Sequence, residues 1–173
     1  RPKKPPAKMA QVNRAPPPPP PKSDGAGGVG MVQLHEEFSA KCIDIFEALT
    51  VTSRISAFTR CSDTVSDARP GGRFALFSGQ ITGGYEDVIP AEFIRCKWRL
   101  SDWPDGLFST VRIVLHELGE HEGCRLELLQ DNVPARAIEA VERQWKERFF
   151  NAIKVAFGYG AVTGAHRQLF SGV

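Results

Sequence analysis

Apolar and polar residues fall into a regular pattern from Met31 almost to the end of the chain. The first stretch alternates, so that Val32, Leu34 and Phe38 lie on one side of an extended segment. Alternation with a period of two is typical of a strand with one buried face. The sequence therefore predicts a first strand that begins near residue 31.

Two short helices are predicted next. Ser39 is a residue type that caps helices, and a helix from there to about Leu49 places three apolar residues on one face: Ile43, Phe46 and Leu49. A second helix, starting at Thr52 or Ser53, carries Ile55 and Phe58.

Turn sequences divide the following part of the chain into short extended segments. Pro70-Gly71-Gly72, Ser78-Gly79 and Pro90-Ala91-Glu92 are rich in residues that favour turns. Between these and two later loops the sequence predicts strands near 64–68, 73–78, 80–89, 93–100, 109–118 and 124–130. We expect these six strands to be antiparallel.

The longest predicted element is a helix from Pro134 to about Phe157, ended by Gly158 and Gly160. Its apolar residues recur at the helical period and form one stripe: Ile138, Val141, Trp145, Phe149, Ala152, Ile153 and Ala156. Phe150 and Phe157 lie off this stripe; either residues 161–173 cover them or they form a small contact patch. A helix with so wide an apolar face needs a large partner, and the sheet is the one of adequate size. The predicted fold class is α+β, a helix-grip: strand, two short helices, six antiparallel strands and a long C-terminal helix packed on the curved sheet.

Composition separates this domain from the start of the chain. The 173 residues have a net charge of +2, but residues 1–30 contain nine of the 13 prolines and six basic groups against one acid. We expect 1–30 to be a disordered basic Pro/Gly-rich linker, 31–160 the helix-grip domain and 161–173 a C-terminal tail. The six-proline run is either a spacer or a ligand for an SH3-type domain.

Several function classes have no support in the sequence. Residues 31–173 carry 16 basic and 19 acidic groups, a sign that excludes a nucleic-acid-binding body, and no apolar stretch is long enough for a membrane span. The pattern GxGxxG at 25–30 lacks the strand before it and the helix after it that a dinucleotide site requires. His116 and His121 are five apart in a predicted hairpin, which does not match a zinc protease motif. We therefore expect no metal, no cofactor and no catalysis.

The four cysteines have no metal-binding spacing, because the nearest two are 19 residues apart. Their even number leaves two disulfides formally possible, but each cysteine lies among core-like neighbours. We expect free buried thiols and, from them, a cytoplasmic location.

The predicted strand 93–100 separates its two faces. Cys96 and Trp98 point to one side, and Arg95 and Lys97 point to the other. Extended over the neighbouring strands, the same alternation gathers five basic residues around a single acid on the outer sheet face: Arg95, Lys97, Arg99, Arg112 and Arg125. This face is either an ordinary solvated surface or a docking face for an acidic partner.

The loop from Ser101 to Phe108 contains a second candidate, Trp103-Pro104. A tryptophan on a loop is either a lid over the core or an exposed anchor for a partner. Both alternatives remain open from the sequence, and both residues are kept as candidate partner-binding residues.

A set of motifs resembles a known family. They are Gly71-Gly72-Arg73-Phe74, Ile81-Thr82-Gly83, Ile89-Pro90, the run from Lys97 to Gly106 (KWRLSDWPDG), and Phe157-Gly158-Tyr159-Gly160. In this order they are similar to the C-terminal domain of the activator of heat shock protein 90 ATPase, within the START-like helix-grip superfamily. The sequence departs from that family at Gln144, Arg148 and Phe149.

The resemblance implies a co-chaperone module that binds the heat shock protein 90 chaperone as a monomer and helps to stimulate its ATPase. It also implies a separate N-terminal domain that this sequence lacks, so we expect weak binding and little stimulation by these residues alone. The alternative is a START-like carrier or enzyme that binds a small apolar ligand between helix and sheet.

Overall fold

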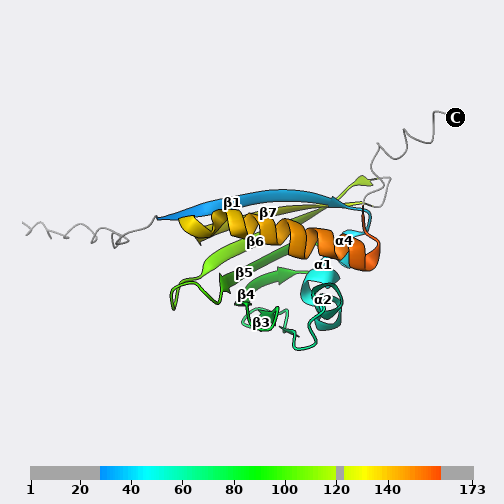
Figure 1. Cartoon of the computed structure of the whole chain (residues 1–173). Helices are drawn as coiled ribbons and strands as arrows, with labels where there is room; N and C mark the ends of the chain where they lie inside the picture. The colour runs from blue at the N-terminus through cyan, green and yellow to red at the C-terminus, as the bar shows by residue number, and fades with distance from the viewer. Residues whose placement is uncertain (1–27, 120–122, 161–173) are drawn as a thin grey trace, which may run out of the picture.

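A computed structural model describes residues 28–119 and 123–160 of the chain. Seven strands form one antiparallel sheet in the order β1-β7-β6-β5-β4-β3-β2 (Figure 1). The strands are β1 (Val29–Phe38), β2 (Val65–Ser66), β3 (Arg73–Leu76), β4 (Ile81–Ile89), β5 (Phe93–Leu100), β6 (Ser109–Glu117) and β7 (Cys124–Pro134). The predicted order of one strand, two helices, six strands and a long helix is confirmed, and with it the helix-grip class.

Two short helices connect β1 to β2: α1 (Cys42–Thr50) and α2 (Thr52–Thr59). Ser39 was predicted to cap α1, but it does not. Its backbone N–H donates to the carbonyl of Tyr159 at 3.0 Å. Lys41 occupies the N-cap position instead. Ile43 in the first turn of α1 is 38 % exposed, whereas the prediction placed it on the buried face.

The C-terminal helix is continuous but not uniform. It begins with a 3₁₀ turn, η2 (Ala135–Ala137), continues as α3 (Ile138–Gln144), passes through a π-helical segment, η3 (Trp145–Asn151), and ends as α4 (Ala152–Phe157). The wider π turn lets three aromatic residues face the core together: Trp145, Phe149 and Phe150. Phe150, predicted off the stripe, is 1 % exposed and meets Phe38 edge-on at 6.1 Å.

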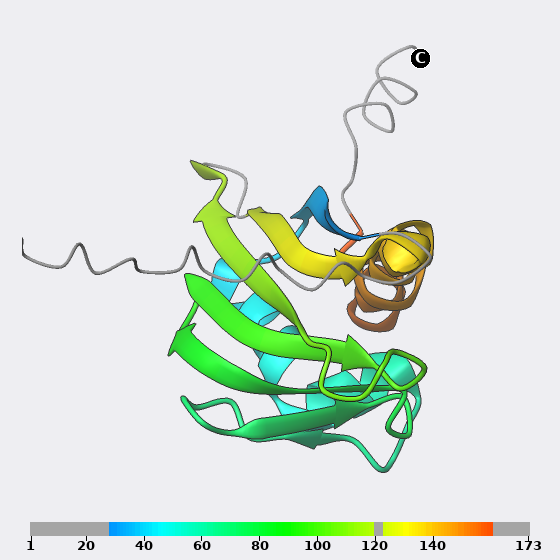
Figure 2. The same cartoon turned by 90° about the vertical axis from the view of Figure 1, so that its left-hand side faces the viewer.

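The core lies between the inner face of the sheet and these helices. Figure 2 looks along the C-terminal helix and shows the strands curving around it, with no described helix on the outer side of the sheet. Trp98 from β5 stacks on Trp145 from the helix, with ring centroids 6.0 Å apart. The outer face of the sheet is therefore available for contacts.

Three predictions fall partly or wholly outside the described residues. The linker and the tail lie there except for 28–30, and so does the hairpin tip at 120–122.

The strand predicted at 64–68 is reduced to two residues, Val65 and Ser66. No helix in the described ranges is long and apolar enough to cross a membrane.

Candidate partner-binding surface

The basic residues predicted on the outer sheet face do lie on that face. Arg95 on β5 is directly opposite Arg112 on β6, and Arg125 on β7 is opposite His116 on β6. We call Arg95, Lys97, Arg99, Arg112 and Arg125 the basic sheet face. Two arginines facing each other across a strand pair repel, so their surroundings decide whether the charge is offset.

On the β4 side this charge is offset by acids that the sequence analysis missed. Arg95 lies 3.2 Å from Glu86 and 3.3 Å from Asp87, and Lys97 lies 3.5 Å from Glu86. The register of β4 shifts between Tyr85 and Asp87. This bulge brings two consecutive carboxylates to the outer face. The prediction of a single acid is therefore wrong, and Arg95 and Lys97 are largely paired.

The β6–β7 side retains unpaired positive charge. Arg112 is exposed and forms no ion pair with any described residue. Arg125 Nε lies 3.5 Å from Glu127 Oε1, and this buried nitrogen has no hydrogen-bond partner within the described ranges. His116 shares the same carboxylate at 3.3 Å. Positive charge is thus concentrated on Arg112 and on the partly satisfied Arg125.

These two arginines border a hollow of about 360 Å³ on the outer face. Its apolar part comes from alternate residues of three strands, because the alternation of a strand puts them on the same side as the arginines: Phe93, Val114 and Leu129. Gln33, His35 and Glu127 add polar groups, and Leu34 and Leu128 also line the hollow. An apolar floor bordered by cations suits a partner that presents acidic and apolar side chains together.

The Arg99 side chain contacts the 101–108 loop and is not directed to the open surface. Its Nη2 donates to the carbonyl of Trp103 at 2.7 Å, and its guanidinium lies 5.6 Å from the ring centroid of Phe108. The distance between Arg99 and the loop is therefore fixed by a charge-assisted hydrogen bond.

The sequence left two alternatives open for Trp103, and in the structure Trp103 is a lid over the core. It is 3 % exposed and its ring meets Trp98 at 5.6 Å. The prediction of Trp103 as a partner-binding anchor is therefore wrong, since its surface is already used in the core. Pro104 beside it is exposed and stays a candidate contact residue.

A glycine-lined groove of about 500 Å³ extends the outer face toward β3. Gly72 and Gly84 leave the backbone bare there, and Phe108, which is 37 % exposed, stands at its edge beside Lys97. This groove was not predicted from the sequence. The pair Gly83-Gly84 in the middle of a predicted strand was the available signal, because glycine in a strand often marks a close approach to the backbone.

The space between helix and sheet is almost filled. Its free volume is about 40 Å³, and its walls include five aromatic rings: Phe74, Tyr85, Trp98, Trp145 and Phe149. Pockets that hold drug-sized ligands have volumes of about 300–1,000 Å³. The interior thus holds no space for a drug-sized apolar ligand without movement of the helix. In the described ranges no three His, Cys, Asp or Glu side chains are grouped as metal ligands.

Comparison with known proteins adds to this geometry. Residues 39–158 match the family model described as Activator of Hsp90 ATPase homolog 1-like protein. The chain is 31 % identical over 131 residues to the Activator of 90 kDa heat shock protein ATPase homolog 1 of Homo sapiens and, to the same extent, to that of Mus musculus; the match covers 75 % of this chain and 38 % of each relative. The chain therefore spans less than half the length of these relatives.

Solved structures agree on the fold. The crystal structure of an HSP90 activator from Plasmodium falciparum superposes with a TM-score of 0.71 at 27 % identity, covering 75 % of this chain and 97 % of that chain. CalU16 from Micromonospora echinospora gives a TM-score of 0.60 at 23 % identity, over 72 % of this chain and 76 % of that one. A likeness at that identity bears on the fold alone.

Proposed function

The chain belongs to the family of Activator of Hsp90 ATPase homolog 1-like proteins, and on this basis we propose that its folded part is a co-chaperone module. In this proposal it binds the Hsp90 chaperone as a cytoplasmic monomer and helps to stimulate the chaperone's ATPase cycle. It contributes binding energy and no chemistry of its own.

The observation that carries the proposal is the hollow bordered by Arg112 and Arg125. Arg112 forms no ion pair with any described residue, so its charge is available for a carboxylate of a partner, while Arg125 beside it is only partly offset by Glu127. The apolar floor beneath it, formed by Phe93, Val114 and Leu129, supplies the area that excludes water from such a pair. We therefore place the main contact on the β6–β7 part of the basic sheet face.

Stimulation requires more than binding. A ligand shifts a conformational equilibrium only by the difference between its affinities for the two states. In our proposal the acidic and apolar groups that fit this hollow come together in one nucleotide state of the chaperone and are farther apart in the other.

The alternative function, a carrier or enzyme with a small apolar ligand inside, fits the structure less well. The space between helix and sheet has a free volume of about 40 Å³, and its aromatic walls already contact one another. A ligand would have to separate Trp98 from Trp145, which removes packing on both sides.

Titration of the fluorescently labelled chain with Hsp90, with and without a non-hydrolysable ATP analogue, tests the proposal. We expect tighter binding in one of the two states. The double variant Arg112→Glu/Arg125→Glu should lose at least roughly tenfold in affinity, with the larger loss at low salt because exposed charges are screened by ions.

A matched control is Arg143→Glu/Lys146→Glu, which reverses two exposed charges on the helix, away from the hollow. It should bind as the unmodified chain does. Absence of binding in both nucleotide states, or an equal loss for the two double variants, would overturn the proposal.

A further inference from the structure

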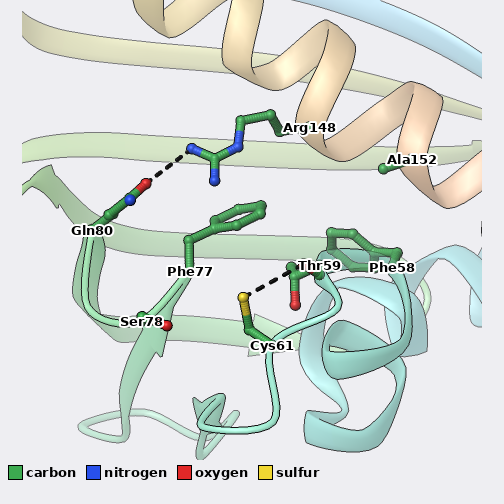
Figure 3. A pocket seen from close by; sticks show the side chains of 8 residues that line it. All are labelled: Phe58, Thr59, Cys61, Phe77, Ser78, Gln80, Arg148 and Ala152. Carbon is green, nitrogen blue, oxygen red and sulfur yellow. Dashed lines mark hydrogen bonds between the residues drawn. The ribbon is translucent and has the colours of Figure 1, made fainter.

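A second hollow lies on the helix side of the sheet, away from the basic sheet face. It has a volume of about 330 Å³ and is formed by α2, the β3–β4 turn and the C-terminal helix (Figure 3). We call it the Arg148 pocket. It is lined by Phe58, Thr59, Cys61, Phe77, Ser78, Gln80, Arg148 and Ala152.

Arg148 is held in a defined position in this pocket. Its guanidinium carbon lies 3.7 Å from the ring centroid of Phe77, and its Nη1 donates to Gln80 Oε1 at 3.1 Å. Figure 3 shows the guanidinium above the Phe77 ring with one nitrogen directed toward Gln80. A guanidinium stacked and bonded in this way loses little further freedom when it binds a carboxylate.

The backbone on both sides of this contact is unusual. Three consecutive residues have positive φ angles: Phe77 (51°), Ser78 (55°) and Gly79 (82°). Residues other than glycine adopt this conformation at an energetic cost. Arg148 comes from the π-helical segment η3. Such segments occur often at functional sites, because they place residues where a regular helix cannot.

The charge of Arg148 is not neutralised from within the described residues, none of which forms an ion pair with it. The rest of the pocket combines apolar and polar walls. Phe58 and Ala152 supply apolar surface, and Thr59, Ser78 and Cys61 supply hydroxyl and thiol groups. The complementary ligand carries a carboxylate next to an apolar group.

We propose that the Arg148 pocket receives an acidic residue and the apolar side chain beside it from a segment of a protein partner. The pocket is an open hollow, which suits side chains that extend from a chain lying on the surface. The carboxylate pairs with Arg148, and the apolar side chain lies against Ala152 and Phe58, since the Phe77 ring is already covered by the guanidinium. This contact goes beyond the proposed function, because it is on the other side of the sheet and does not require the partner to be Hsp90.

The probe for the test is the capped dipeptide N-acetyl-Asp-Phe-amide, followed by NMR of the ¹⁵N-labelled chain. We expect shifts of the Arg148 Nε–H and of the backbone amides of Thr59 and Ser78. The matched N-acetyl-Asn-Phe-amide, which lacks the charge, should bind at least roughly tenfold more weakly. Equal binding of the two dipeptides, or shifts confined to other surfaces, would overturn the proposal.

Two variants separate a binding role of Arg148 from a structural one. Arg148→Gln should lose the preference for the acidic dipeptide, and Arg148→Lys should keep part of it, since the charge remains while the bidentate geometry is lost. Lys146→Gln removes an exposed charge of the same helix and should bind normally. Normal binding by Arg148→Gln would refute the assignment.

A second measurement, the alkylation rate of Cys61, tests occupation of the pocket even if Arg148→Gln perturbs the packing of its walls. Cys61 lines the pocket and is partly exposed, so the bound acidic dipeptide should slow its alkylation by iodoacetamide in the unmodified chain. An unchanged alkylation rate at saturating dipeptide would contradict occupation of the pocket. Both readouts are independent of Hsp90, so failure here leaves the proposed function standing, and the converse also holds.

Discussion

Trp145 donates its indole N–H to Gln130 Oε1 at 2.7 Å, and this bond joins the C-terminal helix to β7 of the sheet. Gln130 in turn donates to Ser109 Oγ at 2.8 Å, and Ser109 donates to the carbonyl of Trp98 at 2.7 Å. All four residues are buried. Each donor in this chain of bonds has its acceptor, and such networks fix one arrangement of a core.

Gln130→Leu should therefore destabilise the fold well beyond its change in volume. It leaves the indole N–H of Trp145 without an acceptor, at a cost of about 1–3 kcal/mol, and it also removes the bond that Ser109 Oγ accepts, worth about 0.5–1.5 kcal/mol. We expect the free energy of unfolding in urea to fall by about 2–4 kcal/mol. Gln33→Leu, the same change on the outer face, should have little effect.

A double-mutant cycle with Trp145→Phe isolates the bond itself. The two variants should be non-additive by about 0.5–3 kcal/mol, since each removes the same interaction. Additive free energies would show that the 2.7 Å contact contributes nothing to the stability of the fold.

Gly83 allows the closest approach within the sheet. A Cβ atom there would lie 1.9 Å from the carbonyl oxygen of Lys97 and 2.3 Å from Phe74 Cζ. Gly83→Ala should lower the free energy of unfolding by about 1–3 kcal/mol or more, the range for overpacked cores. Gly84→Ala is the control on the same strand, because its nearest atom would be Gly72 O at 3.4 Å. Equal thermal midpoints for the two variants would contradict this account.

Alkaline pH should destabilise the fold. Burial raises the pKa of the Cys96 thiol to about 12 and that of the Tyr85 hydroxyl to about 12, and it raises the pKa of Cys42 and Cys124 as well. The folded chain then binds more protons than the unfolded chain above roughly pH 9. The stabilisation is complete below the unfolded pKa values and is lost as the pH rises toward 12. Urea midpoints measured between roughly pH 8 and pH 11 should fall steadily, and a flat profile would refute this.

The cysteines should differ in reactivity in the native state. Cys42, Cys96 and Cys124 are buried and Cys61 is partly exposed. The thiolate is the reacting form, so iodoacetamide should modify Cys61 first and the other three only after unfolding. Mass spectrometry of the alkylated chain measures this order, with Cys61→Ser as the control that removes the fast phase. Early labelling of Cys96 would contradict the burial of β5.

Glu86→Gln should strengthen binding to an acidic partner if the basic sheet face is the contact. The change frees Lys97, which lies 3.5 Å from that carboxylate, and leaves Arg95, 3.2 Å from it, paired with Asp87 alone. We expect the Kd for Hsp90 to fall by a factor of roughly two to five at low salt, since an exposed pair is worth less than about 1 kcal/mol. Glu147→Gln removes an exposed charge on the helix and should leave the Kd unchanged. A Kd unaffected by Glu86→Gln would exclude Lys97 and Arg95 from the contact and confine it to the β6–β7 part of that face.

Local patterns were sufficient for the order of elements. The alternation in 93–100 placed Cys96 and Trp98 inside and Arg95 and Lys97 outside, and the structure confirms this. The end of the long helix was predicted at Phe157, where α4 ends before Gly158 with φ 72°. Both features depend on residues close together in the chain.

Features that depend on distant residues were missed. The bulge after Tyr85 breaks the alternation of β4 by one residue and brings Glu86 and Asp87 to the outer face. The π segment buries Phe150 because Phe38, far away in sequence, packs on it. Trp103 covers the core because its ring packs on Trp98 and because Arg99 donates a hydrogen bond to the carbonyl of Trp103. A prediction from hydrophobic periodicity cannot detect an extra residue in a strand when a contact with a distant part of the chain is the cause of that insertion.

The pairing of β1 has a mechanical consequence. Gly28 O accepts a hydrogen bond from Ala135, at the start of the C-terminal helix, and Tyr159 O accepts one from Ser39, just past the end of β1. The described chain thus enters at one end of β1 and leaves near the other. A pulling force applied at residues 28 and 160 runs along β1, and loads its antiparallel bonds to β7 in shear over the whole of Val29–Phe38. Because those bonds are perpendicular to the strands, they share the load together, and the domain resists extension more strongly than a sheet that opens one bond at a time.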